Sequence, residues 1–480
     1  MLIVVDDDFT WEFLEMIKKI SSVFKQGKWA LLPVIWALAW PTMLEQLLQT
    51  AVQYIDAAMV GRLGAEATAA VGVTTTVSWL LNGTVMALGV GFLFFIAREY
   101  GAGNKERAAQ ASSQAVLVAL VSGTVFTILP LLLYKKIPVW MQADPAIQET
   151  AAIYFLILYI PMLPRAASMI FATALRATGD TKTPMVISTI MNVINVVLNF
   201  LLIYPARDIT LLGFTFPMFG AGLGVVGAAI ASAVSFVFGG VGMTYKLWKH
   251  PVISPKGQKL RPDMTVLRPC LKVAIPAAMQ RFATSFGYVA FASMINSLGT
   301  VATAAHSIAN TVESAFYIPG YGMQAAAATL TGNTVGMKDK RRMKDLTQML
   351  LLIEVTLMVI SGGLLFAFAP GMMQLFTADL AVILLGATVL RMVALSEPIY
   401  GVSIVIEGVL QGVGDTMSAF AFNVIGMWGV RIVGTFICTQ LLSMGLVSAW
   451  ACMIAHNVLL FLLLLIHYKR GKWNPLSKTE

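Results

Sequence analysis

The sequence predicts an all-α polytopic membrane protein with twelve transmembrane helices in two six-helix lobes related by a parallel pseudo-two-fold repeat. Three observations predict this fold. Of 480 residues, 58% are hydrophobic and only 12% are charged, whereas about 25% of the residues of soluble domains are charged. Apolar runs long enough to cross about 30 Å of hydrocarbon recur along the whole chain. The second half of the chain also repeats the first.

Twelve apolar segments are long enough to span a bilayer. We expect spans at about 36–60, 68–97, 110–134, 152–175, 185–204, 222–247, 268–297, 303–334, 348–369, 381–411, 419–441 and 445–468. These spans divide the chain into a cytoplasmic amphipathic segment (1–30), an N-lobe (31–248), a basic cytoplasmic linker (249–267), a C-lobe (268–468) and a cytoplasmic tail (469–480).

The amphipathic segment has its apolar side chains at helical spacing, from Phe9 to Phe24, with lysines among them. This pattern is typical of a helix that lies on an anionic membrane surface. The alternative is a leader without a structural role, with Met16 as the natural start.

Basic residues indicate the orientation of the chain. Of 33 Lys and Arg, 25 fall in the termini and the even-numbered loops, including the run "KDKRRMK" at 338–344, and four fall in the odd-numbered loops. Cytoplasmic loops are rich in Lys and Arg, so both termini are expected in the cytoplasm. The net charge of +9 therefore follows from topology, and no nucleic-acid partner is needed to explain it.

The two halves align at an offset of 235 residues. Pro41 matches Pro276, and "LGAEATAA" at 63–70 matches "LGTVATAA" at 298–305. The polar turn Gly179, Asp180 and Thr181 likewise matches Gly414, Asp415 and Thr416. Six spans per half is an even number, so both halves enter from one side, as in transporters that rock two repeats to give alternating access. We expect the turns to be structural elbows, with glycine at the reversal and Asp capping the next helix.

Several motifs resemble those of the multidrug and toxic compound extrusion (MATE) family. They are "QYIDAAMVGRLGAEATAAVG", "ALRATGDTKTPM" with "NVVLNFLLIYP", and "EGVLQGVGDT". The resemblance implies a monomeric, bacterial inner-membrane antiporter that exports amphiphilic, often cationic, organic compounds in exchange for H⁺ or Na⁺. It implies no cofactor beyond the transported cation and no enzymatic activity.

Asp56 is the strongest coupling candidate, because an ionisable side chain inside a span is costly and therefore a functional candidate. A desolvated carboxylate can take up a proton or hold Na⁺, and the resemblance associates an Asp at this position with cation coupling. Glu45 lies about three turns earlier on the same face. The alternative for either acid is a structural ion pair.

Asn192, Asn195 and Asn199 form a polar stripe on an apolar helix, and Ser232 of the sixth span is a possible hydroxyl partner. Amides there could bind a carboxylate or a cation, or join neighbouring helices. Archaeal and DinF-like members of the family tend to show Asn-x-x-x-Asp at this place, whereas this chain has Asn195-x-x-x-Asn199. The missing acid favours H⁺ slightly over Na⁺.

The second half differs from the NorM-like branch of the family. That branch has an acid in the seventh span and another in the tenth, whereas this chain has Thr284 and Tyr400 near those two places. Its charged residues are closer to the DinF-like pattern. Glu407 is the remaining candidate for a second protonation site, with Arg431 and Arg281 as possible partners. A purely structural Glu–Arg pair is the alternative.

The eighth span carries an acid and aromatic residues that could line a cavity for aromatic cations. These residues are Glu313, Tyr317, Tyr321 and Met323. Glu397 is also an acid within a span. Glu354 lies near a span end, where we expect solvation at the membrane surface.

The chain has no Walker A, HExxH or Ser/His/Asp grouping, and its three cysteines have no metal-ligand spacing. Catalysis and ATP-driven transport are therefore not indicated. The main alternative is a lipid-linked oligosaccharide flippase of the same wider superfamily. Such flippases often line their cavity with several Arg and Lys, whereas the intramembrane cations of this chain are few and scattered.

Overall fold

The computed structural model describes residues 27–211 and 214–478. Most of the expected amphipathic segment, residues 1–26, lies outside them. The first half contains η1 (Gly27–Leu31), α2 (Leu32–Gly61), α3 (Ala65–Gly101), α4 (Lys105–Leu133), α5 (Lys136–Trp140), α6 (Pro145–Tyr159), α7 (Met162–Ala177), α8 (Lys182–Leu202), β1 (Pro205–Leu211), β2 (Phe214–Ala221) and α9 (Gly224–Trp248).

The second half has the same order of long helices. It contains α10 (Met264–Asn296), α11 (Thr300–Phe316), α12 (Ile318–Met337), α13 (Lys340–Gln374), α14 (Leu380–Ala394), α15 (Glu397–Val413), α16 (Thr416–Val424), η2 (Ile425–Ile432), α17 (Val433–Phe436), η3 (Ile437–Leu441), α18 (Leu446–Lys469) and η4 (Pro475–Lys478). The segments η2 and η3 are π-helical, so the rod that begins with α16 is locally widened.

The helices of the described residues form twelve rods, as the sequence predicts. In the described part of the chain, eight helices are long and apolar enough to cross a membrane, and the bent pairs α6–α7 (53°) and α14–α15 (55°) each qualify as one span. The remaining two rods are α10 and α11–α12, which carry the ionisable residues Arg281 and Glu313.

Three rods that the sequence predicts as continuous are broken in two. A proline stands at or just after each break: Pro161 before α7, Pro319 in α12 and Pro398 in α15. Proline lacks the N–H of a helical hydrogen bond and its ring clashes with the preceding turn, but it fits the first turn of a new helix. These prolines therefore end one helix and begin the next.

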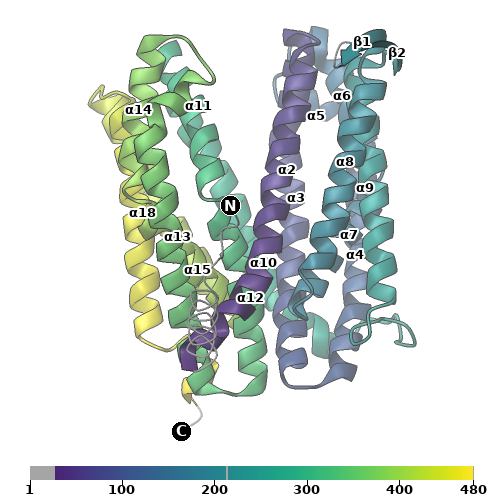
Figure 1. Cartoon of the computed structure of the whole chain (residues 1–480), viewed down its shortest axis with the longest axis vertical. Coiled ribbons are helices and arrows are strands. Elements are labelled where there is room, and N and C mark those ends of the chain that lie inside the picture. The colour runs from purple at the N-terminus through teal and green to yellow at the C-terminus, as the bar shows by residue number, and fades with distance from the viewer. Residues whose placement is uncertain (1–26, 212–213, 479–480) are drawn as a thin grey trace, which may run out of the picture.

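The rods are grouped in two lobes, α2–α9 and α10–α18 (Figure 1). Their contact follows the repeat. Gly101 packs against the carbonyl of Asn333, and Gly336 packs against the carbonyl of Arg98, so that a Cβ on either glycine would overlap the opposing backbone. Shifting one contact by 235 residues gives the other. The pseudo-two-fold axis therefore passes between these two contacts.

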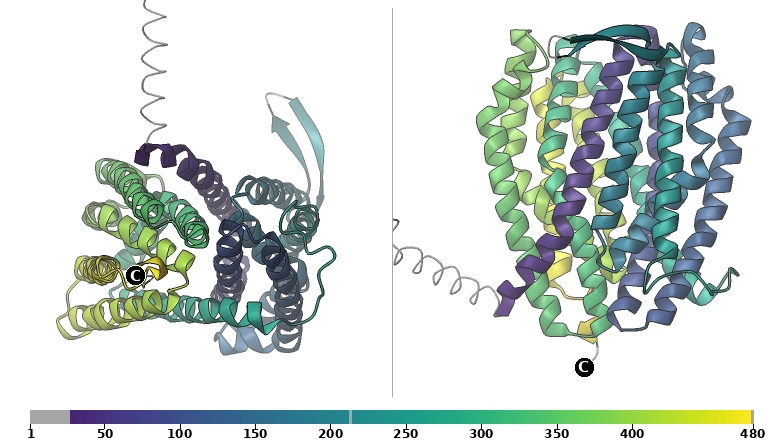
Figure 2. Two further views of the ribbon diagram at one scale, coloured as in Figure 1. Left: turned by 90° about the horizontal axis from the view of Figure 1, so that it is seen from below. Right: turned by 45° about the vertical axis from the view of Figure 1, so that its right-hand side comes forward.

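The lobes meet at one end and diverge towards the other (Figure 1), and the β1–β2 hairpin lies at the second end (Figure 2). We call the first the elbow end, because it carries the turns at 178–181 and 414–416, and the second the hairpin end, because it carries β1–β2. A Cβ on Gly91 of α3 would lie 3.1 Å from Ala274 of α10, and one on Gly322 of α12 would lie 3.1 Å from the carbonyl of Ala39 of α2. Each lobe thus packs its second rod on the first rod of the other.

The antiparallel β1–β2 hairpin is a pair of strands that the sequence does not predict. It occupies the link that we expect between the fifth and sixth spans, and the second half has only a short turn, 442–445, at the corresponding place. This difference in length interrupts the offset of 235 after the fifth rod of each lobe.

Candidate cation-coupling site

Asp56 lies in a chain of polar side chains inside the first lobe. Asn199 Nδ2 donates to Asp56 Oδ1 at 2.5 Å and to Asn195 Oδ1 at 3.1 Å. Asn195 Nδ2 in turn lies 3.2 Å from Ser232 Oγ. In the other orientation of the Asn195 side-chain amide, with its nitrogen and oxygen exchanged, the nitrogen donates to Asp56 Oδ1 at 2.9 Å and the oxygen accepts from Ser232. Three rods, α2, α8 and α9, therefore contribute to one cluster around a carboxylate.

Helical spacing explains how the cluster forms. Asn195 and Asn199 are one turn apart on α8, and both are buried together with Asn192. Buried amides need hydrogen-bond partners, and the Nδ2 atoms of Asn199 and Asn195 find them in Asp56 of α2 and Ser232 of α9. Asn192 Nδ2 has no partner among the described residues. The structure thus brings together four of the five residues that we expect at the coupling site.

Glu45, the fifth, does not join this cluster. It is buried, and it accepts from Arg176 Nη2 at 2.6 Å and from Ser188 Oγ at 2.8 Å. The side chains of Arg176 and Glu45 are 16% and 11% exposed. Glu45 therefore forms an ion pair between α2 and α7, and Ser188 of α8 donates to the same carboxylate. This is the structural ion pair that the sequence leaves open as an alternative.

Glu407 is held by amides from three rods of the second lobe. Asn423 donates to Oε1, Gln280 donates to Oε1 at 3.4 Å, and Gln324 donates to Oε2 at 3.4 Å. Under the offset of 235 residues, Gln280 corresponds to Glu45, Gln411 to Arg176 and Asn423 to Ser188. We call the set Glu45, Arg176 and Ser188 the polar node of the first lobe. The second lobe has polar residues at the same three positions, but its carboxylate, Glu407, comes from a different position and the arginine is replaced by Gln411.

Arg431, one of the two possible partners of Glu407, makes no ion pair with it among the described residues. Arg431 is buried, and its guanidinium lies over the rings of Phe291 and Tyr288, with 4.1 Å and 4.9 Å to the ring centroids. It interacts electrostatically with Glu313. Arg281 is exposed and within electrostatic range of Glu407. Arg431, in the π-helical part of its rod, therefore packs against two aromatic rings of α10.

Of the four expected cavity residues, three lie near one another at the α11–α12 break. The ring centroids of Tyr317 and Tyr321 are 5.5 Å apart in an edge-to-face arrangement, and Tyr400 of α15 is 6.0 Å from Tyr317. Glu313 is buried in the last turn of α11. The expectation for Met323 is wrong: its side chain is 0% exposed, in a core that the start of α2 shares with the second lobe.

Both polar turns have the geometry of structural elbows. Gly179 and Gly414 have φ of +90° and +89°, a region that favours glycine. Asp180 accepts from the N–H of Thr183 and Asp415 from the N–H of Ser418, so each caps the next helix. The hydroxyls of Thr181 and Thr416 donate to carbonyls of the first rod of their own lobe, those of Ala37 and Val273.

A histidine lies beside each elbow. His467 Nε2 is 2.7 Å from Asp415 Oδ2. At the other elbow, His250 Nε2 is 3.3 Å from Thr178 Oγ1, while its Nδ1 accepts from the N–H groups of Val252 and Ile253. Burial lowers the pKa of the His250 imidazole, although Asp180 opposes this shift. These contacts fix each elbow against the end of its own lobe.

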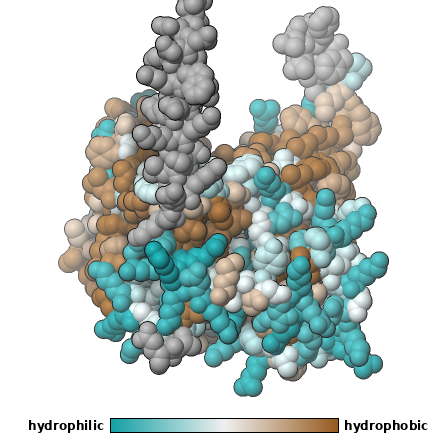
Figure 3. Space-filling view, turned by 60° about the horizontal axis from the view of Figure 1, so that its bottom comes forward, coloured by the Kyte–Doolittle hydropathy of each residue, from teal (hydrophilic) through white to brown (hydrophobic). Residues whose placement is uncertain are grey.

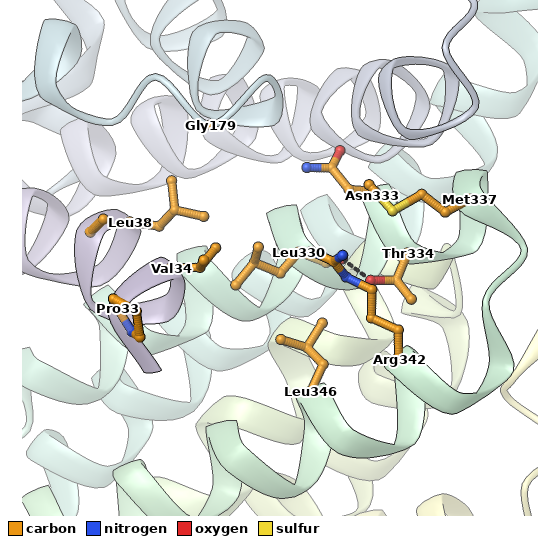
Figure 4. Close-up of a pocket in the computed structure, with 11 residues that line it drawn as sticks. Pro33, Val34, Leu38, Gly179, Leu330, Asn333, Thr334, Met337, Arg342 and Leu346 are labelled. Atoms are coloured by element: carbon orange, nitrogen blue, oxygen red, sulfur yellow. Dashed lines mark hydrogen bonds between the residues drawn. The ribbon is translucent and has the colours of Figure 1, made fainter. Parts of the chain in front are cut away.

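A pocket of about 430 Å³ lies between the lobes at the elbow end (Figure 4). Its walls come from the start of α2, the Gly179 elbow, the end of α12 and the start of α13, and they are mostly apolar, with Arg342 as the charged residue. The pocket is separate from the Asp56 cluster.

The comparison with family models decides the classification. The MatE model matches two stretches, residues 41–201 and 276–437, which together cover about two thirds of the chain. The chain belongs to the MatE family. The two matched stretches begin at Pro41 and Pro276, which are the residues paired by the offset of 235.

Curated relatives of this MatE chain agree with that assignment, and solved structures of other proteins share its fold. The Probable multidrug resistance protein NorM of Thermotoga maritima is 27% identical over 436 residues, which is 91% of this chain and 92% of that protein. The Probable multidrug resistance protein YoeA of Bacillus subtilis is 25% identical over 420 residues, 85% and 87% of the two chains. A crystal structure of MATE in complex with MaD3S has a TM-score of 0.85 at 23% identity and covers 93% of this chain and 97% of that chain. A multidrug resistance MATE family transporter in an outward-facing conformation has a TM-score of 0.82 at 23% identity, with 93% and 96% covered.

Some residues of the MatE chain are important in the structure but are missed by the sequence analysis. Arg176 and Asn423 complete the two polar nodes. Asn423 is the residue that corresponds to Ser188 at the offset of 235, so the repeat contains a signal for it. Tyr54, two residues before Asp56, donates across the lobes to the carbonyl of Thr311 at 3.3 Å. Glu354 is 0% exposed, so the expected solvation at a span end is wrong.

Proposed function

We propose that this MatE chain is a cation-coupled antiporter that exports amphiphilic, often cationic, organic compounds by alternating access. Asp56 is the coupling carboxylate, supported by Asn195, Asn199 and Ser232. The relatives named above are described as multidrug resistance proteins, and this description supports the class of substrate proposed here. A chemically broad substrate range fits a surface of aromatic rings, such as those of Tyr317, Tyr321 and Tyr400.

The observation that carries the proposal is the neutral surrounding of Asp56. Its hydrogen-bond partner is an amide, and the described residues give it no ion pair. A carboxylate inside a membrane without a cationic partner is costly to keep charged. It therefore favours a bound cation, and proton or Na⁺ occupancy can be linked to the position of α2.

The proton is the preferred coupling ion. Na⁺ needs several oxygen ligands, but Asn199 presents its amide nitrogen to Asp56. The second acid of the Asn-x-x-x-Asp pattern is also replaced, by Asn199. The charged residues remain closer to the DinF-like than to the NorM-like pattern.

The distribution of hydrophilic side chains supports the proposed orientation. They gather at the elbow end (Figure 3), where the basic linker and the run 338–344 lie. We assign this end and both termini to the cytoplasm of a bacterial inner membrane, with the protein acting as a monomer. The lobes then meet on the cytoplasmic side and diverge outwards, which corresponds to an outward-facing state.

The flippase alternative needs cationic side chains that are open to a lipid-linked pyrophosphate. Two arginines inside the rods, Arg165 and Arg431, lie over aromatic rings, with 3.9 Å from the guanidinium carbon of Arg165 to the centroid of the Phe236 ring. This arrangement favours the exporter.

Dye uptake into everted membrane vesicles, whose lumen corresponds to the outside of the cell, tests the proposal. A pH gradient and a Na⁺ gradient are imposed separately, and vesicles without the protein provide the baseline. We expect dye movement that needs the pH gradient and stops when an ionophore dissipates it. Equal transport without any cation gradient would contradict the proposed coupling.

A further inference from the structure

Two acids in the interior of the second lobe have no role in the proposed coupling at Asp56. Glu354 on α13 and Glu397 at the start of α15 are 0% and 1% exposed. In the described part of the chain, none of their four carboxylate oxygens has a hydrogen-bond partner. Glu397 interacts electrostatically with Glu354 and with Glu313 of α11, which lies at the α11–α12 break.

Glu354 reaches into a notch between two glycines. A Cβ on Gly320 of α12 would lie 2.9 Å from Glu354 Oε1, and one on Gly401 of α15 would lie 2.8 Å from the same atom. The rest of the notch is apolar: the same two positions also meet Met358 and Ile404. A third glycine, Gly362 of α13, leaves room for the Cβ of Glu397. The backbone is thus shaped around both acids.

This surrounding is incompatible with two ionised carboxylates. An ionised group without a partner in an apolar medium is far costlier than its neutral form. The titratable groups that face the two acids are Glu313 and, at the helix break, Tyr317, and neither of these supplies a positive charge. Arg431 interacts with Glu313, so it compensates that acid instead.

A metal ion does not fit these residues as well as a proton does. Na⁺ or Ca²⁺ needs about six oxygen ligands, whereas the notch offers carboxylates and hydrocarbon. No group of three or more His, Cys, Asp or Glu in the described ranges is arranged to hold a metal. The ligand that neutralises a carboxylate without further donors is H⁺.

We propose that Glu354 and Glu397 form a proton-binding site inside the second lobe, separate from Asp56, and that both acids are protonated in the conformation described here. The site joins the α11–α12 break to the α14–α15 break. Loss of either proton would leave an unpaired charge in the core and force these broken rods to repack. A role of this site in transport depends on the antiport proposed above, whereas the binding of protons to the site does not.

Infrared spectroscopy of the purified full-length protein tests the occupancy directly. The readout is the carbonyl-stretch band of protonated carboxylic acids at an alkaline pH, where exposed carboxylates are ionised. The D56N background removes the contribution of the first lobe. We expect a band that shifts in D₂O and loses amplitude in E354Q and in E397Q, but not in E106Q, which changes an exposed acid on α4.

Unchanged band amplitude in both variants would overturn the proposal. Both substitutions mimic the shape and neutrality of the protonated acid, so they are expected to fold. If neither can be purified, absence of the band in the D56N protein itself overturns it. The two proposals fail separately: transport without cation coupling contradicts the antiport and leaves the band, whereas coupled transport without the band contradicts only the second site.

Discussion

Asp56 and Glu45 lie on the same helix, yet one is surrounded by amides and the other is paired with an arginine. Their separation is eleven residues, about three turns, so they share a face without sharing a site. The second lobe repeats only the node around Glu45, where Gln280 and Gln411 replace the ion pair and Glu407 brings the acid from a different rod. The two lobes therefore have polar residues at the same positions, but the carboxylate lies on a different helix in each.

The Glu45–Arg176 pair should behave as a structural ion pair. R176Q or E45Q alone leaves a poorly solvated charge, so each should destabilise the protein by about 3 kcal/mol. The double variant E45Q/R176Q resembles the node of the second lobe and should recover most of this loss. Melting temperatures of the purified variants in detergent form the double-mutant cycle. Additive losses would show that the two residues do not act as a pair.

The sequence predicts part of the candidate site well. Asn195, Asn199, Ser232 and Asp56 have helical spacing or an unusual position in a span, and these local signals do not depend on the packing of the lobes. Arg176 and Met323 show why the rest is missed. A basic residue near a span end is predicted to be solvated, and a methionine beside tyrosines is predicted to line their cavity. Only the three-dimensional packing shows that one reaches back to Glu45 and the other faces the core.

At the level of elements, prolines set the shape of the rods. The twelve spans can be predicted because apolar length is a property of the sequence alone. Their breaks are harder to predict, because proline also occurs within unbroken helices of this chain, as Pro41 and Pro276 do. What distinguishes Pro319 and Pro398 is a polar or acidic neighbourhood at the break that includes Tyr317 and Glu397.

The two elbow glycines offer a matched comparison. Gly179 and Gly414 have the same left-handed backbone, so alanine at either should cost about 1–2 kcal/mol. A Cβ on Gly414 would also lie 2.8 Å from the ring of Phe94, while one on Gly179 has Leu38 at 3.8 Å. G414A should therefore lower the melting temperature more than G179A does. An equal or smaller effect of G414A would contradict the tight packing assigned to this elbow.

The whole molecule is organised around the seam where Gly101 and Gly336 lie against the other lobe. Because each glycine approaches a backbone carbonyl, a larger side chain cannot fit without parting the lobes at the elbow end. The symmetry of the two contacts implies that both must separate together when the seam opens.

G336A should hold the seam partly open. Spin labels on K105C and K338C, two exposed positions on opposite sides of the seam, report the separation in a cysteine-free background. We expect a longer mean distance in G336A than in the parent protein. G363A is the control, because a Cβ there has no neighbour within 4 Å. An identical distance distribution in G336A and G363A would contradict the role of the seam.

The central claim is that Asp56 couples cation movement to export. The most direct test compares D56N with the parent protein in everted vesicles, with pH and Na⁺ gradients imposed separately and protein levels matched. E66Q, an exposed acid at the hairpin end, is the control. We expect D56N to lose gradient-driven dye uptake into the vesicles, whereas E66Q retains it. Uptake by D56N at the parent rate under either gradient would contradict the assignment.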